Sequence, residues 1–168
     1  DAYAIYSLFA AIGYAGPSIA GIIADKLLGF RNMVKLGAMI MILGHFTLAF
    51  IDLNGKLLYL GLALIAIGTG FFKGNAVNLL GACYGAKDSY KGFNLFYVSI
   101  QVGSFAASII CGYTANVYGW HFGFAAAGVG MVLGLVTFLK FEYTLQNYGL
   151  MPESKFKNKT YYGLSPLV

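Results

Sequence analysis

Long apolar segments alternate with short polar ones along almost the whole chain. Each apolar segment is close to the roughly 20 residues that an α-helix needs to cross about 30 Å of hydrocarbon. The five segments cover about 4–24, 33–53, 57–80, 93–115 and 120–139. They are rich in Leu, Ile, Ala and Gly and show no two-residue alternation, which favours helices over a β-barrel. The pattern predicts an all-α membrane protein with five transmembrane helices.

The composition supports a membrane protein and argues against an enzyme. Of 168 residues, 59% are hydrophobic and 10% are charged, against about 25% charged residues in soluble proteins. The mean hydropathy is +0.72. No nucleophile, acid pair or metal cluster suggests catalysis. Cys83 and Cys111 lack a CxxC spacing and a nearby His, so we expect no metal site and no bound cofactor.

The net charge of +5 is best explained by membrane topology, because the basic residues lie in short loops and form no stripe for nucleic acid. One side of the predicted membrane carries Lys26, Arg31, Lys35, Lys87, Lys91, Lys140, Lys155, Lys157 and Lys159. Lys56 alone lies in a loop on the other side. The positive-inside rule therefore places the first loop, the third loop and the tail in the cytoplasm, and the 54–56 and 116–119 turns outside.

The domain prediction follows from this topology. Residues 1–141 are predicted to form a helical bundle in the lipid bilayer of the plasma membrane, and residues 142–168 a polar cytoplasmic linker. The chain starts without Met, and five spans with an outside start are unusual for a whole transporter. We therefore expect at least one further helix upstream, in a larger protein.

Lys73 is the most informative polar residue, because it lies inside the third apolar segment. At about 1.5 Å per residue it is roughly 12 Å from Gly81, close to the midplane of the membrane. A charged amine at this depth costs several kcal/mol unless it is paired or hydrated. The carboxylates are all at helix ends or in loops. We expect the partner of Lys73 to be an acid elsewhere or a substrate carboxylate, and the alternative is that Lys73 reaches the headgroups along its stem.

Two further polar residues fall at a similar depth. Gln101 is predicted about 14 Å from the cytoplasmic side, and Tyr14 about 17 Å. Transporter substrate sites are expected near the midplane, so an amine, an amide and a phenol there suit a small polar ligand. The alternative for Gln101 and Tyr14 is ordinary interhelical hydrogen bonding, and Asn75 and Tyr97 are expected to serve helix packing near the site.

Three stretches carry a family resemblance. Residues 21–31, GIIADKLLGFR, resemble the loop between the second and third helices of major facilitator transporters. Residues 68–75, GTGFFKGN, and 93–103, FNLFYVSIQVG, resemble fourth- and fifth-helix motifs of proton-dependent oligopeptide transporters. The likeness runs from about residue 3 to residue 140. It implies that the five spans match helices 2 to 6 of an amino-terminal six-helix bundle.

The resemblance also implies a function, namely import of di- and tripeptides by a proton-coupled symporter with alternating access. Lys73 would contact the substrate carboxylate and take part in proton coupling, Tyr14 would line the peptide site, and Gln101 would bind the peptide backbone. The family usually has Asn at the position of Gln101 and Pro at the position of Gly74.

A gating loop is implied as well, with Asp25 as its aspartate and Gly21, Gly29 and Arg31 as the other motif residues. The implied partners are small peptides, the lipid bilayer, and a first helix and carboxy-terminal bundle of the same protein, with no nucleic acid and with protons as the coupling ion. We expect this chain not to transport alone. The alternatives are a related carrier for nitrate or amino acids, and a channel or other non-transporting membrane subunit.

Overall fold

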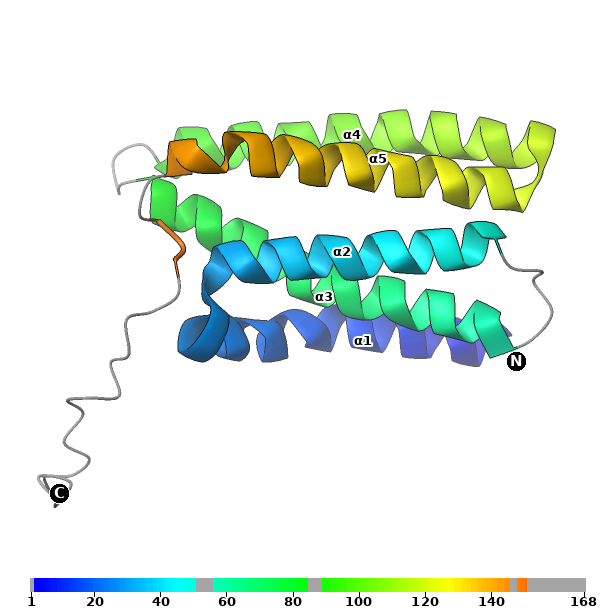
Figure 1. The fold of residues 1–168 in the computed structure, drawn as a ribbon, viewed down its shortest axis with the longest axis horizontal. Coiled ribbons are helices and arrows are strands. Elements are labelled where there is room, and N and C mark those ends of the chain that lie inside the picture. The colour runs from blue at the N-terminus through cyan, green and yellow to red at the C-terminus, as the bar shows by residue number, and fades with distance from the viewer. Residues whose placement is uncertain (1, 51–55, 85–88, 146–147, 151–168) are drawn as a thin grey trace, which may run out of the picture.

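The computed structural model describes residues 2–50, 56–84, 89–145 and 148–150, and most of them lie in five α-helices. The helices are α1 (Ala2–Ile23), α2 (Gly29–Phe50), α3 (Lys56–Cys83), α4 (Ser89–Tyr118) and α5 (Trp120–Phe141). Successive helices run in opposite directions, so that α1, α3 and α5 end where α2 and α4 begin (Figure 1).

The helices extend beyond several of the predicted apolar segments. α3 continues to Cys83, and α4 begins at Ser89 and ends at Tyr118. Hydropathy marks only the part of a helix that suits hydrocarbon, whereas backbone hydrogen bonding continues into the polar turns on either side. At these ends the helices therefore extend past the predicted apolar segments, and which part of each helix crosses the membrane stays a prediction.

Among the residues that the structure describes, four segments are long and apolar enough to cross a membrane. They are Ala15–Phe50, Leu57–Cys83, Tyr90–Tyr118 and Trp120–Leu145. The first of them combines the end of α1 with α2, because the connection between the two helices, Ala24–Leu28, is itself a π-helical turn. Figure 1 shows that the chain nevertheless reverses direction there. For the residues that the structure describes, the prediction of an all-helical fold is confirmed.

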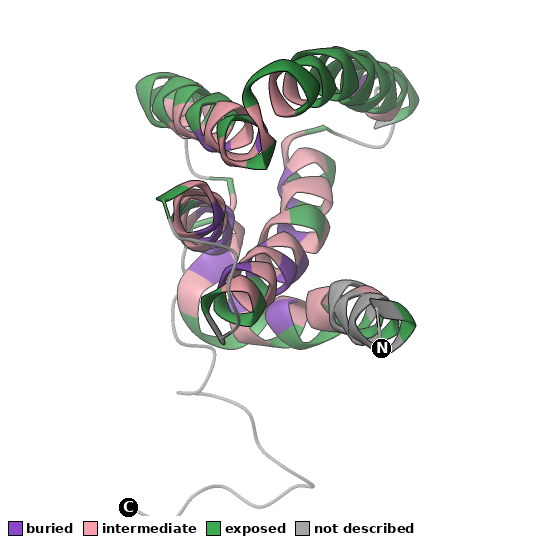
Figure 2. Ribbon diagram, turned by 90° about the vertical axis from the view of Figure 1, so that its right-hand side faces the viewer, coloured by how far each residue is buried: buried purple, intermediate pink, exposed green. Residues whose placement is uncertain are grey.

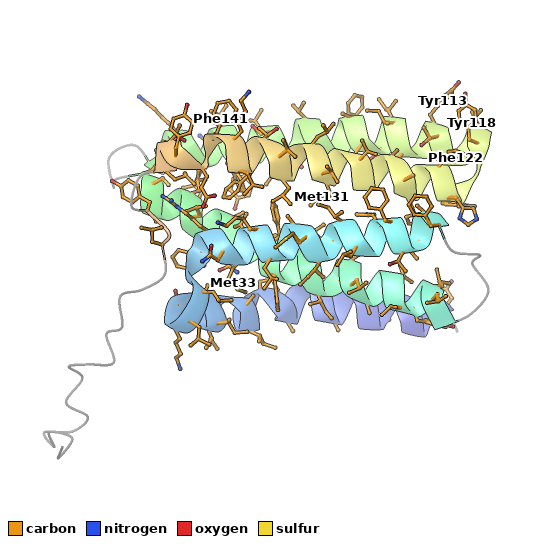
Figure 3. The ribbon with its side chains drawn as sticks, viewed as in Figure 1. Met33, Tyr113, Tyr118, Phe122, Met131 and Phe141 are labelled. Carbon is orange, nitrogen blue, oxygen red and sulfur yellow. The ribbon has the colours of Figure 1, made fainter. Side chains whose placement is uncertain are left out.

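Glycines allow both of the tight reversals that the structure describes. Gly29 follows the π-helical turn with a φ of 75°, and Gly119 separates α4 from α5 with a φ of 103°. Side chains disfavour this left-handed region, so glycine is the residue of choice at each position. Tyr118 and Phe122 flank the second reversal (Figure 3), with their ring centroids 5.9 Å apart.

The helices are packed unevenly. α3 lies against both α1 and α2, α2 also lies against α5, and α5 lies against α4. Buried residues gather on α2, α3 and the end of α1, whereas the exposed surface is largest on the α4–α5 pair (Figure 2). In the part of the chain that the structure describes, none of the most apolar stretch of α4 is buried. α4 is therefore the peripheral helix, and α3 is central.

Candidate functional site

The three predicted site residues lie at similar levels of the bundle. The end of α1, the end of α3 and the start of α4 are at the same end of the molecule (Figure 1). At about 1.5 Å per residue, Tyr14 is about 14 Å from the end of α1, Lys73 about 15 Å from the end of α3, and Gln101 about 18 Å from the start of α4. The helical backbone therefore places the three residues in the middle turns of three different helices.

The side chain of Lys73 is exposed on α3, and it forms no hydrogen bond or ion pair with any residue that the structure describes. Its neighbours along the helix include Phe71 and Phe72, within a segment apolar enough to cross a membrane. In hydrocarbon an unpaired ammonium is costly, so this amine requires water, an acid or an anionic ligand. A carboxylate would meet that requirement with a charge-assisted hydrogen bond.

Close packing against α1 fixes the α3 backbone both before and after Lys73, at Gly70 and Gly74. A Cβ built on Gly70 would lie 2.9 Å from the Cα of Gly16, and one built on Gly74 would lie 3.0 Å from the Cβ of Pro17. Such small residues allow two helix backbones to touch. The face of α3 that carries Gly70 and Gly74 is therefore occupied by α1, and Lys73 projects from the remaining surface.

The two residues predicted to pack near the site have different environments. Asn75 is fully buried, and its Nδ2 donates a hydrogen bond to the backbone oxygen of Phe71 at 2.8 Å. Its Oδ1 has no partner among the described residues. Tyr97 is 55% exposed on α4, beside the ring of Phe96. Asn75, two residues after Lys73, thus lies inside the bundle, whereas Tyr97 lies on the surface of the bundle.

Gln101 is exposed on α4 and makes no hydrogen bond with a described residue. The side chain of Tyr14 lies outside the described part of the chain, so only the position of its backbone in α1 can be compared with the prediction. The structure does not join Lys73 and Gln101 directly. Both side chains are instead free to contact a ligand or further protein, and their substrate roles stay predictions.

Of the residues in the predicted gating loop, some face open space or are exposed and others are buried in the bundle. Gly21 has open space where a Cβ would be, and Asp25 is exposed in the π-helical turn. Gly29 and Arg31 are buried at the start of α2. The backbone nitrogen of Arg31 donates a hydrogen bond to the backbone oxygen of Gly149 at 3.0 Å. A hydropathy pattern gives no signal for the burial of this charged residue.

Sequence reasoning also missed one ion pair. The Nζ of Lys35 lies 2.9 Å from Oε1 of Glu142, and both side chains are 25% exposed. The available signal was that two opposite charges stand at the ends of apolar segments on the same predicted side of the membrane. Among the described residues, no group of three His, Cys, Asp or Glu side chains could hold a metal ion.

Comparisons with known proteins give a consistent result. A model of the POT family matches residues 31–159. The chain is 35% identical over 162 residues to the dipeptide and tripeptide permease B of Aliivibrio fischeri strain MJ11, covering 95% of this chain and 33% of that protein. It is 34% identical over 155 residues to the dipeptide and tripeptide permease A of Enterobacter sp. strain 638, covering 91% of this chain and 31% of that protein.

Solved structures show the same likeness. The fold is similar to a crystal structure of peptide transporter POT in complex with sulfate, with a TM-score of 0.82, 35% identity, and coverage of 88% of this chain and 30% of that one. It is also similar to a crystal structure of a POT family transporter in complex with 5-aminolevulinic acid, with a TM-score of 0.82 and 32% identity. That match covers 91% of this chain and 33% of the other. The chain thus spans about a third of the length of the curated relatives that it matches.

Proposed function

The chain belongs to the POT family, and on that basis we propose that it forms part of a proton-coupled symporter that imports di- and tripeptides by alternating access. The observation that carries the proposal is Lys73, an exposed amine in the middle of an apolar helix with no acidic partner among the described residues. Such residues usually mark a substrate or ion pathway. The relatives that the chain resembles are peptide permeases, which supplies the substrate class.

The proposed topology assigns the five α-helices to helices 2 to 6 of an amino-terminal six-helix bundle that crosses the plasma membrane. The alternating directions of the helices support five crossings (Figure 1). The excess of Lys and Arg in the first loop, the third loop and the tail supports a cytoplasmic location for these parts. The end of the molecule at which α1, α3 and α5 finish is then the cytoplasmic end.

In the proposed site, Lys73 binds the carboxylate of the peptide and Gln101 and Tyr14 hydrogen-bond its backbone. The positive charge of Lys73 links substrate binding to proton movement, because protonation of an acid on the pathway changes what the amine can pair with. Asn75 holds the α3 turn in place from inside the bundle, with its amide bonded to the helix itself. Protons are the only coupling ion proposed, and no cofactor is invoked.

The π-helical turn between α1 and α2 is proposed to act as a cytoplasmic gating loop. Its motif places Asp25 outward, where it can contact another part of the transporter, and buries Arg31 against the bundle. Transport then depends on protein beyond this chain, since alternating access requires two bundles that rock about a central site. In a transporter of the relatives' length, a first helix would complete the amino-terminal bundle and a carboxy-terminal bundle would be the second of the two, so this chain alone would not transport.

The experiment that tests the proposal uses the full-length transporter that contains this chain, reconstituted in proteoliposomes. Inward proton gradients should drive accumulation of a labelled dipeptide, and an uncoupler should abolish it. Lys73→Ala should abolish the gradient-driven accumulation while exchange of labelled for unlabelled peptide persists. The matched control is Lys91→Ala, since Lys91 is an exposed lysine in the first turn of α4. Normal accumulation by a folded Lys73→Ala protein would refute the role of this lysine.

Competition with the labelled dipeptide separates this function from the related carriers. Unlabelled di- and tripeptides should compete, whereas nitrate and single amino acids should not. Uptake of nitrate or an amino acid that is driven by the gradient and insensitive to dipeptide would overturn the proposed substrate class. Dipeptide flux that equilibrates without accumulation under a proton gradient would identify a channel.

A further inference from the structure

The chain returns to the bundle after α5 and contacts the beginning of α2. A 3₁₀-helical turn, Glu142–Leu145, follows α5 directly. The carboxylate of Glu142 pairs with the ammonium of Lys35 at 2.9 Å, across 107 positions of sequence. A few residues later, the backbone oxygen of Gly149 accepts a hydrogen bond from the backbone nitrogen of Arg31 at 3.0 Å. Lys35 and Arg31 are one helical turn apart, so both contacts are made to neighbouring turns of α2.

The second contact also satisfies a backbone group of α2. The first four N–H groups of an α-helix have no partner within the helix. Arg31 lies in the first turn of α2, whose first residue is Gly29, so its N–H is one of these groups. Arg31 is only 6% exposed, which leaves little access for water. The oxygen of Gly149 therefore completes the amino-terminal turn of α2.

Gly149 is fitted to this position in two independent ways. Its φ of 70° lies in the left-handed region that side chains disfavour. A Cβ at this position would also collide with Cδ1 of Leu79 on α3 and would lie 3.2 Å from Cγ of Arg31. Leu79 is 5% exposed. Gly149 thus lies between α2 and α3, where a larger residue would have to displace the side chain of Leu79 and adopt a disfavoured φ.

We propose that residues 142–145 and 148–150 form a clasp that fixes the end of α5 to both α2 and α3, with the Lys35–Glu142 ion pair as its lock. Helix packing alone places α5 against α2 and α4. The clasp adds a connection from α5 to α3, the helix that carries Lys73. Because the ion pair, the backbone hydrogen bond and the glycine wedge all act on the same short segment, release of one weakens the hold on the other two.

The thiol of Cys83 can report whether the clasp is in contact with α3. It lies one helical turn beyond Leu79 on α3 and is half-buried. When the clasp is released from α3, this thiol should become more accessible to a water-soluble maleimide. The protein for the test is the full-length transporter with its other cysteines, including Cys111, replaced by serine, so that labelling measures Cys83 alone.

The test reverses the charges of the lock one at a time and then together. Lys35→Glu places two carboxylates, and Glu142→Lys two ammonium groups, where an ion pair stood, so each should raise the labelling rate of Cys83 about threefold or more. The double variant Lys35→Glu, Glu142→Lys restores an opposite-charge pair and should return the rate to within about twofold of the unchanged protein. Lys91→Glu is the matched control, since it reverses the charge of an exposed lysine at the same end of the bundle.

Gly149→Ala tests the wedge without changing any charge. It should raise Cys83 labelling as the single charge reversals do, because the alanine must displace the side chain of Leu79 and adopt a positive φ that side chains disfavour. The clasp is refuted if the single reversals label no faster than Lys91→Glu, or if the double reversal labels as fast as the single ones. The labelling rate of Cys83 does not depend on peptide uptake. The proposed transport function can therefore fail while the clasp stands, and the clasp can fail while the transport function stands.

Discussion

Gly37 of α2 faces the backbone of α3 next to the proposed site and offers a sharp test of the packing. A Cβ built on Gly37 of α2 would lie 2.6 Å from the backbone nitrogen of Phe72, 2.8 Å from the backbone oxygen of Gly68 and 3.0 Å from Cα of Phe72. All three atoms belong to the backbone of α3, so no side-chain rotation can relieve the contact. Phe72 immediately precedes Lys73.

The size of the effect follows from these distances. Carbon contacts are normally about 3.5–4.0 Å, so relief of the 3.0 Å approach to Cα of Phe72 alone requires the two helices to move apart by about 0.5 Å at this point. Overpacking of this kind typically costs about 1–3 kcal/mol, and an alanine in a helix recovers up to about 1 kcal/mol of propensity relative to glycine. We therefore expect a net destabilisation of up to about 2 kcal/mol for Gly37→Ala, and of about 1–3 kcal/mol relative to an alanine that gains the same helix propensity without overpacking.

The matched control is Gly103→Ala on α4, where a Cβ would meet nothing within 4 Å. It gains helix propensity without a clash, so it should be neutral or slightly stabilising. Thermal unfolding of the full-length transporter in detergent should place Gly37→Ala about 2–6 °C below Gly103→Ala. Uptake by the folded Gly37→Ala protein should also fall, because the displaced backbone carries Lys73. An unfolding temperature no lower than that of the control would refute the geometry of the α2–α3 contact.

Four further outcomes are expected. Gln101→Ala should weaken the apparent affinity for dipeptide about two- to tenfold, the effect of losing one hydrogen bond to a neutral group, and should leave proton dependence intact; unchanged affinity would exclude a substrate contact. Gln101→Asn should be milder, because it keeps both the donor and the acceptor, and Tyr14→Phe should resemble Gln101→Ala in uptake measurements. Impermeant thiol reagents should label Lys87→Cys from the cytoplasm and Asn54→Cys from outside, and the reverse pattern would invert the topology.

Some features of the site were predictable because they depend on position along a helix. Lys73 and Gln101 were placed in middle turns by counting residues, and the structure keeps both in the middle of α3 and α4. The burial of Asn75 and the exposure of Tyr97 were not predictable in this way, since both were expected to pack between helices. Which side of a helix faces a neighbour depends on where that neighbour lies, and neither α3 nor α4 has a strongly one-sided sequence.

The sequence by itself determined that the protein is a helical membrane bundle and where each helix runs, because hydropathy over about 20 residues reports directly on the surrounding solvent. Only the tertiary structure decided that α3 lies between α1 and α2, that Gly37 meets Phe72, and that Lys35 pairs with Glu142. These contacts join residues far apart in the chain. They depend on the shape of both surfaces and on how closely two backbones can approach, which no local pattern specifies.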